Sequence, residues 1–261
     1  MPRIEHETRL MNTETPACPV CQGQSEWLDV VDFNKCCEEP KGVFLPRAGV
    51  PIYYASCGQC GFCFAPEIMR WSLADFAERI YNDAYARIDP DYLEVRPLGN
   101  AQNLQAMFGG LPSFRHLDYG GGNGKMASVL QQSGWRSVSY DPFVNRETVL
   151  ETLGQFELIT AFEVFEHVPD VHQLMRELRG RLAPEGVLLF TTLLTDGNIR
   201  PNERLSWWYA SPRNGHISLF SRNSLLRLAK AYGFNFGSFS AGFHVMFTTV
   251  PAWAAHLIRK A

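Results

Sequence analysis

The stretch "FRHLDYGGGNGKMASVLQQSG", residues 114–134, decides the fold of this 261-residue chain. An apolar strand leads into a glycine-rich loop, and a helical pattern follows the loop. Gly120, Gly121, Gly122 and Gly124 allow the backbone to turn sharply and to approach a ligand closely. The order of strand, glycine loop and helix predicts a nucleotide-binding α/β domain.

The sequence after the glycine loop extends the same pattern. The next predicted strand, "WRSVSYD", ends in Asp141, and an acidic residue in this place is suited to bind ribose hydroxyls. The continuous apolar runs at residues 156–162 and 187–194 are typical of strands buried on both faces. Helical patterns occupy residues 171–186 and 221–234. Alternating strands and helices predict a doubly wound, mainly parallel sheet with ligands at the carboxyl ends of its strands.

Composition limits the class of protein. The chain is 46% hydrophobic, which suits one full-sized domain and a small extra module. A net charge of −3 gives no basic field for nucleic acid. No apolar run approaches the ~20 residues needed to span a membrane, and the first 17 residues lack the apolar core of a signal peptide. We therefore expect a cytoplasmic protein that binds neither nucleic acid nor membrane.

All seven cysteines lie between Cys18 and Cys63. "CPVC" and "CGQC" form two matched pairs, and two such pairs close a structural tetrahedral zinc site. Disulfides are less expected in a reducing cytosol, and a redox role for one pair would not explain the other. We therefore predict a zinc ribbon, with Cys63 a buried strand residue and Cys36 and Cys37 unassigned. The predicted zinc ligands are Cys18, Cys21, Cys57 and Cys60.

Three segments follow from this distribution. We predict a zinc-ribbon module over residues 1–66, a helical linker or lid over 67–110, and the ligand-binding domain over 111–261. Ser72 or Asp75 is suited to cap the first linker helix. Tyr92 and Arg96 lie just before the main domain, either as surface residues or as part of a lid over the ligand.

The stretch "TAFEVFEHVPD", residues 160–170, places Glu163, Glu166 and His167 directly after a buried strand. A helix that begins there would put all three on one face, because residues three and four apart are neighbours. A later loop, "NGHISLFS", supplies His216. Carboxylates with imidazoles suit Mg²⁺ or another divalent ion. The alternative is that His167 caps the helix, Glu163 touches the cofactor, and His216 is structural.

From about Tyr92 to the C-terminus, the chain resembles class I S-adenosylmethionine-dependent methyltransferases. The resemblance rests on "LDYGGGNG", "YDP", "FELITAFEVFEHV" and "LAPEGVLLFTT". It implies a Rossmann-like, doubly wound, seven-stranded sheet and S-adenosylmethionine as the methyl donor. It also implies a set of donor-binding residues. Asp118, Gly120 and Gly122 would border the methionine part of the donor, and Glu163 would also contact the donor. Arg96 would bind the carboxylate, Asp141 the ribose, and Phe143 would lie near the adenine.

The Glu-x-x-Glu-His motif is similar to that of two metal-dependent groups, the ubiquinone-biosynthesis O-methyltransferases and the 2′-O-methyltransferases of small-RNA 3′ ends. This resemblance implies a second divalent ion, which would lower the pKa of an acceptor hydroxyl. Its implied ligands are Glu163, Glu166, His167 and His216. The last three are also the predicted catalytic residues.

We expect the acceptor wall in residues 198–220. Trp207, Trp208 and Tyr209 could stack on a ring or sugar, and nearby arginines (Arg200, Arg204 and Arg213) could hold a phosphate or carboxylate. The prediction is O-methylation of a small hydroxylated or sugar-containing metabolite, including a nucleotide-linked sugar. The alternatives are a metal-independent C-methyltransferase on a nucleotide-linked keto-sugar, an RNA 2′-O-methyltransferase, and a non-catalytic adaptor.

Overall fold

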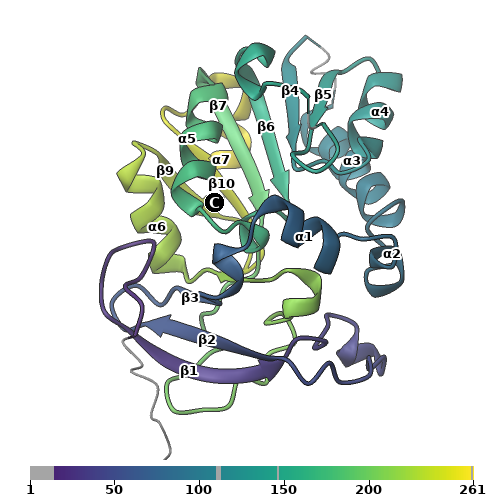
Figure 1. Cartoon of the computed structure of the whole chain (residues 1–261). Coiled ribbons are helices and arrows are strands. Elements are labelled where there is room, and N and C mark those ends of the chain that lie inside the picture. Colours follow the sequence, from purple (N-terminus) through teal and green to yellow (C-terminus); the bar gives the residue numbers. More distant parts are fainter. Residues whose placement is uncertain (1–14, 110–112, 146, 260) are drawn as a thin grey trace, which may run out of the picture.

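The centre of the fold is a six-stranded mixed sheet in the order β5-β4-β6-β7-β10-β9 (Figure 1). The computed structural model describes residues 15–109, 113–145, 147–259 and 261. β5, β4, β6 and β7 are parallel, whereas β10 is antiparallel to both β7 and β9. The strands are β4 (Arg115–Tyr119), β5 (Arg136–Tyr140), β6 (Phe156–Phe162), β7 (Leu182–Thr191), β9 (Asn235–Ser238) and β10 (Phe243–Phe247).

The α/β class is confirmed, but the sheet has six strands in the described part of the chain where seven were predicted. Residues 141–155 connect β5 to β6, and their only described helical element is the short 3-10 helix η3 (Leu150–Leu153). One parallel crossover already needs about a dozen residues. This connection is therefore too short for a further strand and a second crossover.

Helices cover both faces of the central sheet. Residues of α3, α4 and α7 share one buried cluster with β6, β7 and β10, whereas α5 and α6 pack on the opposite face. These helices are α3 (Val95–Phe108), α4 (Lys125–Gln132), α5 (Val171–Arg181), α6 (Arg222–Ala231) and α7 (Ala255–Ile258). Neighbouring residues of β7 point to opposite faces, and both faces are buried, which explains its continuous apolar sequence.

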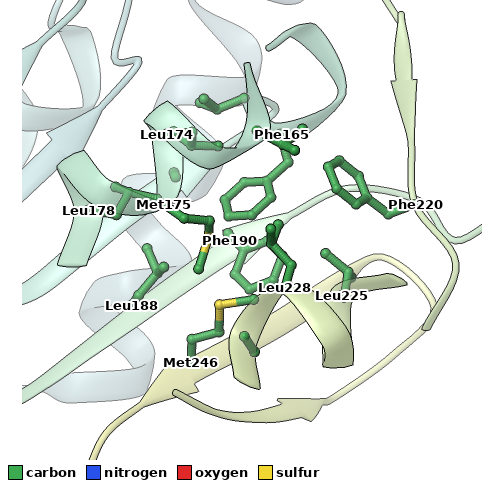
Figure 2. Close-up of a cluster of buried hydrophobic side chains, with 14 of the residues drawn as sticks. Phe165, Leu174, Met175, Leu178, Leu188, Phe190, Phe220, Leu225, Leu228 and Met246 are labelled. Carbon is green, nitrogen blue, oxygen red and sulfur yellow. The ribbon is translucent and has the colours of Figure 1, made fainter. Parts of the chain in front are cut away.

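Figure 2 shows the core between the sheet, α5 and α6. Phe165 and Phe190 stack with ring centroids 4.2 Å apart, and Phe220 meets Phe165 edge-on at 5.8 Å. Leu174, Met175, Leu178, Leu225 and Leu228 close this cluster from the two helices. Phe165 lies two residues after Glu163, so the core anchors the segment that carries the predicted site.

A second, four-stranded antiparallel sheet has the order β1-β2-β3-β8. Its strands are β1 (Ser25–Asp32), β2 (Pro51–Cys57), β3 (Cys63–Phe64) and β8 (Ser218–Leu219). Cys63 is fully buried in β3, as expected. β8 comes from the loop after β7, so the cysteine-rich segment and the main domain share one sheet.

Side-chain bonds fasten the cysteine pairs to the main domain as well. Ser221, which caps α6, donates to the carbonyl oxygen of Cys60. Asn223 Nδ2 donates to the Gln59 carbonyl at 3.0 Å, and a ring nitrogen of His172 lies 2.8 Å from the Pro19 carbonyl. Both cysteine loops are therefore held by α5 and α6.

The segment between the two sheets contains α1 (Leu73–Arg79) and α2 (Tyr85–Ile88). The Ser72 hydroxyl accepts from the Asp75 N–H and the Asp75 carboxylate accepts from the Ser72 N–H, so both predicted residues cap α1. α1 crosses the carboxyl ends of β6 and β7 (Figure 1). Within the described residues, no helix is long and apolar enough to cross a membrane.

Candidate functional site

A cavity of about 670 Å³ opens at the carboxyl ends of β4, β5 and β6. Its size falls within the ~300–1,000 Å³ typical of small-molecule sites. The glycine loop, the turn after β5 and the turn after β6 form its base, and α1, α2 and the start of α3 form its cover. The predicted donor-binding residues all line it: Arg96, Asp118, Gly120, Gly122, Asp141, Phe143 and Glu163.

The glycine loop is tightly fitted to the strands around it. Gly120 has φ +73°, and a Cβ there would lie 2.4 Å from Val164 Cγ2. A Cβ on Gly121 would lie 2.4 Å from Ser139 Oγ and 2.5 Å from a carboxylate oxygen of Asp118. Side chains at these positions would displace the loop, which explains the run of glycines.

Two carboxylates flank this loop. Asp141 follows β5 and accepts a hydrogen bond from the Gly122 N–H at 3.0 Å. Asp118 lies inside β4, and burial raises its pKa to about 7, with a weaker opposing bond from Thr160. A buried acid with so high a pKa beside a cavity is typical of a ligand-binding site.

The turn after β6 differs from the expected helix. Glu163 adopts φ +54°, and only the 3-10 helix η4 (Phe165–His167) follows. The prediction that Glu163, Glu166 and His167 share one helical face is therefore wrong. Instead, the Glu163 carboxylate accepts from Thr191 Oγ1 at 2.9 Å.

Glu166, His167 and His216 do come together. One possible ligand atom from each lies within 4.8 Å of the other two, and the two imidazole rings meet edge-on with centroids 4.8 Å apart. Glu163 lies outside this group. His167 Nδ1 is 3.0 Å from the hydroxyl of Tyr81, and both side chains line the cavity.

Burial governs the charge of this group. It raises the pKa of Glu166 well above its usual value, with the Glu163 carboxylate adding to the effect. It lowers the pKa of His167 to about 3, and it lowers the pKa of His216 well below its ordinary value. Glu166 Oε1 accepts from the Tyr209 hydroxyl at 2.6 Å, while Oε2 is buried with no hydrogen-bond partner. A bound cation would offset the cost of burying the Glu166 carboxylate and would give its unpaired Oε2 a partner.

His216 owes its position to the cysteine-rich segment. The buried hydroxyl of Tyr54, in β2, donates to the His216 carbonyl at 2.7 Å. The N–H of Cys37 donates to Asn214 Oδ1 at 2.9 Å, and Lys35 Nζ donates to the carbonyls of Trp207 and Ala210. The cysteine-rich segment therefore supports the loop that carries His216 into the cavity.

Arg96 and Tyr92 line the cavity rather than the outer surface. Arg96 forms an ion pair with Asp89. Burial acts to lower the pKa of Arg96, but the Asp89 carboxylate contributes to outweighing it, so the pKa is raised. Tyr92 Cε2 would lie 3.9 Å from a Cβ on Gly122, so its ring covers the glycine loop. These positions agree with the lid alternative.

The four cysteines of the two pairs form a compact group. Cys18 Sγ lies 3.6 Å from Cys60 Sγ, and Cys21 Sγ lies 3.5 Å from Cys57 Sγ. Four sulfurs around a zinc ion at ~2.3 Å would be roughly 3.8 Å apart, so the spacing fits a tetrahedral ion. The hydrogen bond with Cys60 lowers the pKa of Cys18, which favours its thiolate form. Cys37 lies outside this group, 3.7 Å from His216 Nδ1.

The prediction that residues 198–220 form the acceptor wall is wrong. Of these residues, only His216 lines the cavity. Trp207 and Tyr209 are buried in the cluster around the second sheet. The three arginines are also engaged elsewhere: Arg200 with Glu203, Arg204 with Asp29, and Arg213 with the Ile80 carbonyl.

Aromatic residues of the linker segment line the cavity instead. Trp71, Phe76, Tyr81 and Tyr85 line the cavity. Their aromatic character was visible in the sequence, but helical spacing alone does not separate core residues from cavity residues. Only the position of α1 and α2 over the sheet makes the distinction.

Comparison with known proteins agrees with this geometry. A family model described as a methyltransferase domain matches residues 84–237, which is more than half of the chain. A ubiquinone biosynthesis O-methyltransferase from Histophilus somni is 25% identical over 120 residues, covering 35% of this chain and 50% of that protein. One from Acinetobacter baumannii is 25% identical over 129 residues, covering 38% and 54%. The chain spans about half the length of these curated relatives.

Among solved structures, an O-methyltransferase family protein from Burkholderia thailandensis has a TM-score of 0.50 at 15% identity. The match covers 71% of this chain and 67% of that one. At this identity the likeness concerns the fold alone.

Proposed function

We propose that this chain, which belongs to the methyltransferase-domain family, is an S-adenosylmethionine-dependent methyltransferase that methylates a hydroxyl oxygen of a small molecule. One observation carries the proposal: the same cavity contains the glycine loop, Asp141 and the imidazoles of His167 and His216. Donor and acceptor could therefore meet in one enclosed space.

The donor is proposed to lie along the glycine loop. Asp141 would bind the ribose hydroxyls, and the Gly120–Gly122 backbone would lie against the methionine part. Asp118 and Glu163 would face its amino group, Phe143 its adenine, and Arg96 its carboxylate. Arg96 already pairs with Asp89, so the donor carboxylate would share this guanidinium.

Bound S-adenosylmethionine supplies a methyl carbon made electrophilic by its sulfonium. The acceptor oxygen would attack this carbon in line, so that a carbon–oxygen bond forms while the carbon–sulfur bond breaks and S-adenosylhomocysteine leaves, and the hydroxyl proton would pass to solvent. The chain contributes mainly orientation of the two reactants. α1 and α2, which cover the cavity, would also exclude water from the reaction.

We further propose that Glu166, His167 and His216 hold a divalent ion. The unpaired, buried Glu166 Oε2 and the proximity of the three side chains support this fit. Such an ion would lower the pKa of a bound hydroxyl. Tyr81 would fix the ring of His167 through the 3.0 Å contact with Nδ1.

The cysteine group is proposed to hold a structural zinc ion. Four sulfur ligands leave no open coordination position, so this ion would take no part in methyl transfer. Its role would be to hold together the two cysteine loops that contact α5 and α6.

Calorimetry and elemental analysis test these proposals together. S-adenosylmethionine should bind the purified protein, and about one zinc should be present per chain, with a second ion taken up from Mg²⁺ or Mn²⁺ solution. Glu166→Gln and His216→Ala should lose the second ion and keep the zinc. Absence of donor binding would refute the methyltransferase assignment.

The proposal of a second ion can be refuted independently of the proposed methyl transfer. Donor binding with zinc alone, unchanged in Glu166→Gln, would exclude the ion and favour metal-free transfer. Asp141→Asn is the matched donor-site variant. Its loss of charge-assisted bonds, about 1.5–3 kcal/mol each, should weaken donor binding about tenfold or more without changing either metal.

A further inference from the structure

Four buried polar side chains, which we call the polar row, cross three neighbouring strands and end at Asp118. His116 Nδ1, in β4, lies 2.7 Å from Ser137 Oγ in β5, and His116 Nε2 lies 2.9 Å from Thr160 Oγ1 in β6. The Thr160 hydroxyl lies 3.4 Å from Asp118 Oδ1. No member of the row is more than 3% exposed, and of the four only Asp118 lines the cavity. The polar row therefore connects the interior of the sheet with the donor site.

The register of the strands produces this row. His116 pairs with Ser137 in the ladder between β4 and β5, and Asp118 pairs with Thr160 in the ladder between β4 and β6. His116 and Asp118 are two residues apart in β4, so their side chains point to the same face of the sheet. The His116 ring also meets Trp135 edge-on, with centroids 5.9 Å apart. Because buried polar groups are costly without hydrogen bonds, each member depends on its neighbours in the row.

Two arrangements of hydrogen atoms keep all three contacts of the row. Burial lowers the pKa of His116 to about 3, so its imidazole is neutral and has one N–H and one lone pair. When Asp118 is charged, it accepts from the Thr160 hydroxyl, which in turn accepts from His116 Nε2–H. His116 Nδ1 then accepts from Ser137. When Asp118 is protonated, each of these bonds can run in the opposite direction, so the row can hold Asp118 in either form.

The charge of Asp118 depends on groups from several elements. Burial and the Asp141 carboxylate, after β5, disfavour its charged form, whereas the Thr160 hydroxyl favours it. Arg96 is paired with Asp89, and Lys125, at the start of α4, lies 2.9 Å from Glu94. The other carboxylates that line the cavity are Asp89, Glu163, Asp170 and Glu177.

The remaining titratable groups of the cavity stay neutral near pH 7. Burial lowers the pKa of both imidazoles, His167 and His216. It raises the pKa of the tyrosines that line the cavity, which are Tyr81, Tyr85, Tyr92, Tyr119 and Tyr140. A change of protonation on donor binding near pH 6 therefore points to Asp118.

We propose that His116 and Thr160 are positioning residues that hold Asp118 ready to release one proton when the donor binds. The inference rests on the proposed methyl transfer, in which the cationic amino group of the donor faces Asp118. An opposite charge close to a carboxyl group favours its charged form. The proton passes from Asp118 to solvent, and the Thr160 hydroxyl then donates to the charged carboxylate.

Calorimetry in buffers of different ionisation enthalpy counts the protons released when S-adenosylhomocysteine binds. The full chain should release about one proton per ligand at about pH 6, because the pKa of Asp118 before binding is about 7. Asp118→Asn, which has no proton to release, should release close to none. Binding by the parent chain without proton release would overturn the proposal, as would release that persists in Asp118→Asn. Failure of S-adenosylhomocysteine to bind the parent chain would instead refute the proposed function itself.

Thr160→Val tests the row even where Asp118→Asn does not bind. It keeps the shape of the side chain and removes the hydroxyl that donates to Asp118. The pKa of Asp118 should rise by about half a unit to one unit, so affinity at pH 6 should fall about three- to tenfold. At about pH 8 the loss should shrink to about twofold or less, because Asp118 is then mostly charged before the ligand arrives. An equal loss at both pH values would overturn the proposal.

His116→Leu tests whether His116 acts through Thr160. The substitution removes the ring that orients the Thr160 hydroxyl, so the loss of affinity should again be larger at pH 6 than at pH 8. The double variant with Thr160→Val should lose no more affinity than Thr160→Val alone, because one residue acts through the other. Additive losses would refute the positioning role of His116.

His244, in β10, supplies a matched control. Its imidazole is also fully buried, and its ring nitrogens lie 2.8 Å from Ser238 Oγ and 2.9 Å from the Thr192 carbonyl. Neither His244 nor Ser238 lines the cavity. Ser238→Ala removes one hydroxyl from a buried histidine network of the same sheet, and it should change affinity less than about twofold at either pH. If Ser238→Ala reproduced the effect of Thr160→Val, the effect would be a general one on the sheet and the proposal would fail.

Discussion

Replacing Tyr54 with phenylalanine removes one hydroxyl that joins the cysteine-rich segment to the loop carrying His216. The Tyr54 side chain is fully buried, and its hydroxyl donates to the His216 carbonyl at 2.7 Å. The substitution leaves this carbonyl without the bond in a site that water does not reach. Loss of such a bond, with a buried partner left unpaired, costs about 1–3 kcal/mol.

Tyr53→Phe is the matched control, because Tyr53 is the preceding residue of β2, is 49% exposed, and points to the other face. Surface changes of this kind alter the free energy of unfolding by about 0.5 kcal/mol or less. Urea unfolding followed by tryptophan fluorescence should therefore show a lower midpoint for Tyr54→Phe only. Equal midpoints for the two variants would refute the reasoning.

The same variant separates support of His216 from donor binding. Tyr54 does not line the cavity, whereas His216 does. Affinity for S-adenosylhomocysteine should stay within about twofold of the parent, since no donor-site group is changed. A large loss of donor affinity would show that the second sheet supports the glycine loop instead.

Three further outcomes are expected. Burial raises the pKa of Asp118 from 3.8 to about 7, so the folded chain keeps a proton on this carboxyl that the unfolded chain releases; the contribution of Asp118 to the free energy of unfolding should fall as pH rises from about 4 to about 7, and urea titrations should show the difference between Asp118→Asn and the parent changing over this window. Cys60→Ser should lose the zinc measured by elemental analysis and lower the melting temperature, whereas Cys63→Ser, outside the cysteine group, should keep the zinc. Gly121→Ala should abolish donor binding in calorimetry, because its Cβ would lie 2.5 Å from Asp118, whereas Gly180→Ala, with open space around it in α5, should bind the donor normally and gain up to about 1 kcal/mol.

Short-range patterns gave the fold class correctly because they report local geometry. The glycines of residues 120–124 are required by a turn that packs against Ser139 and Val164, and the apolar run of β7 is required by burial on both faces. Ser72 was recognisable as a cap because capping depends on residues three apart. The seventh strand was expected from resemblance rather than from length, and the short β5–β6 connection rules it out.

The parts that sequence reasoning missed depend on contacts between distant segments. The helix expected at Glu163 is replaced by a turn with positive φ, since Phe165 must reach the core beneath α5. Trp207 and Tyr209 looked like an acceptor wall, but they fill the space behind the second sheet.

By itself, the sequence determined the strand–glycine–helix unit, the carboxylate at the end of the second strand of that unit, and the two cysteine pairs. Each of these is a local pattern whose residues lie close together in the sequence. Only the tertiary structure decided that β8 joins the cysteine-rich sheet, that Tyr54 therefore holds His216 beside Glu166, and that residues of α1, rather than most of residues 198–220, line the cavity. These arrangements join residues far apart in the sequence, such as Tyr54 and His216, which are 162 positions apart, and packing rather than local propensity selects them.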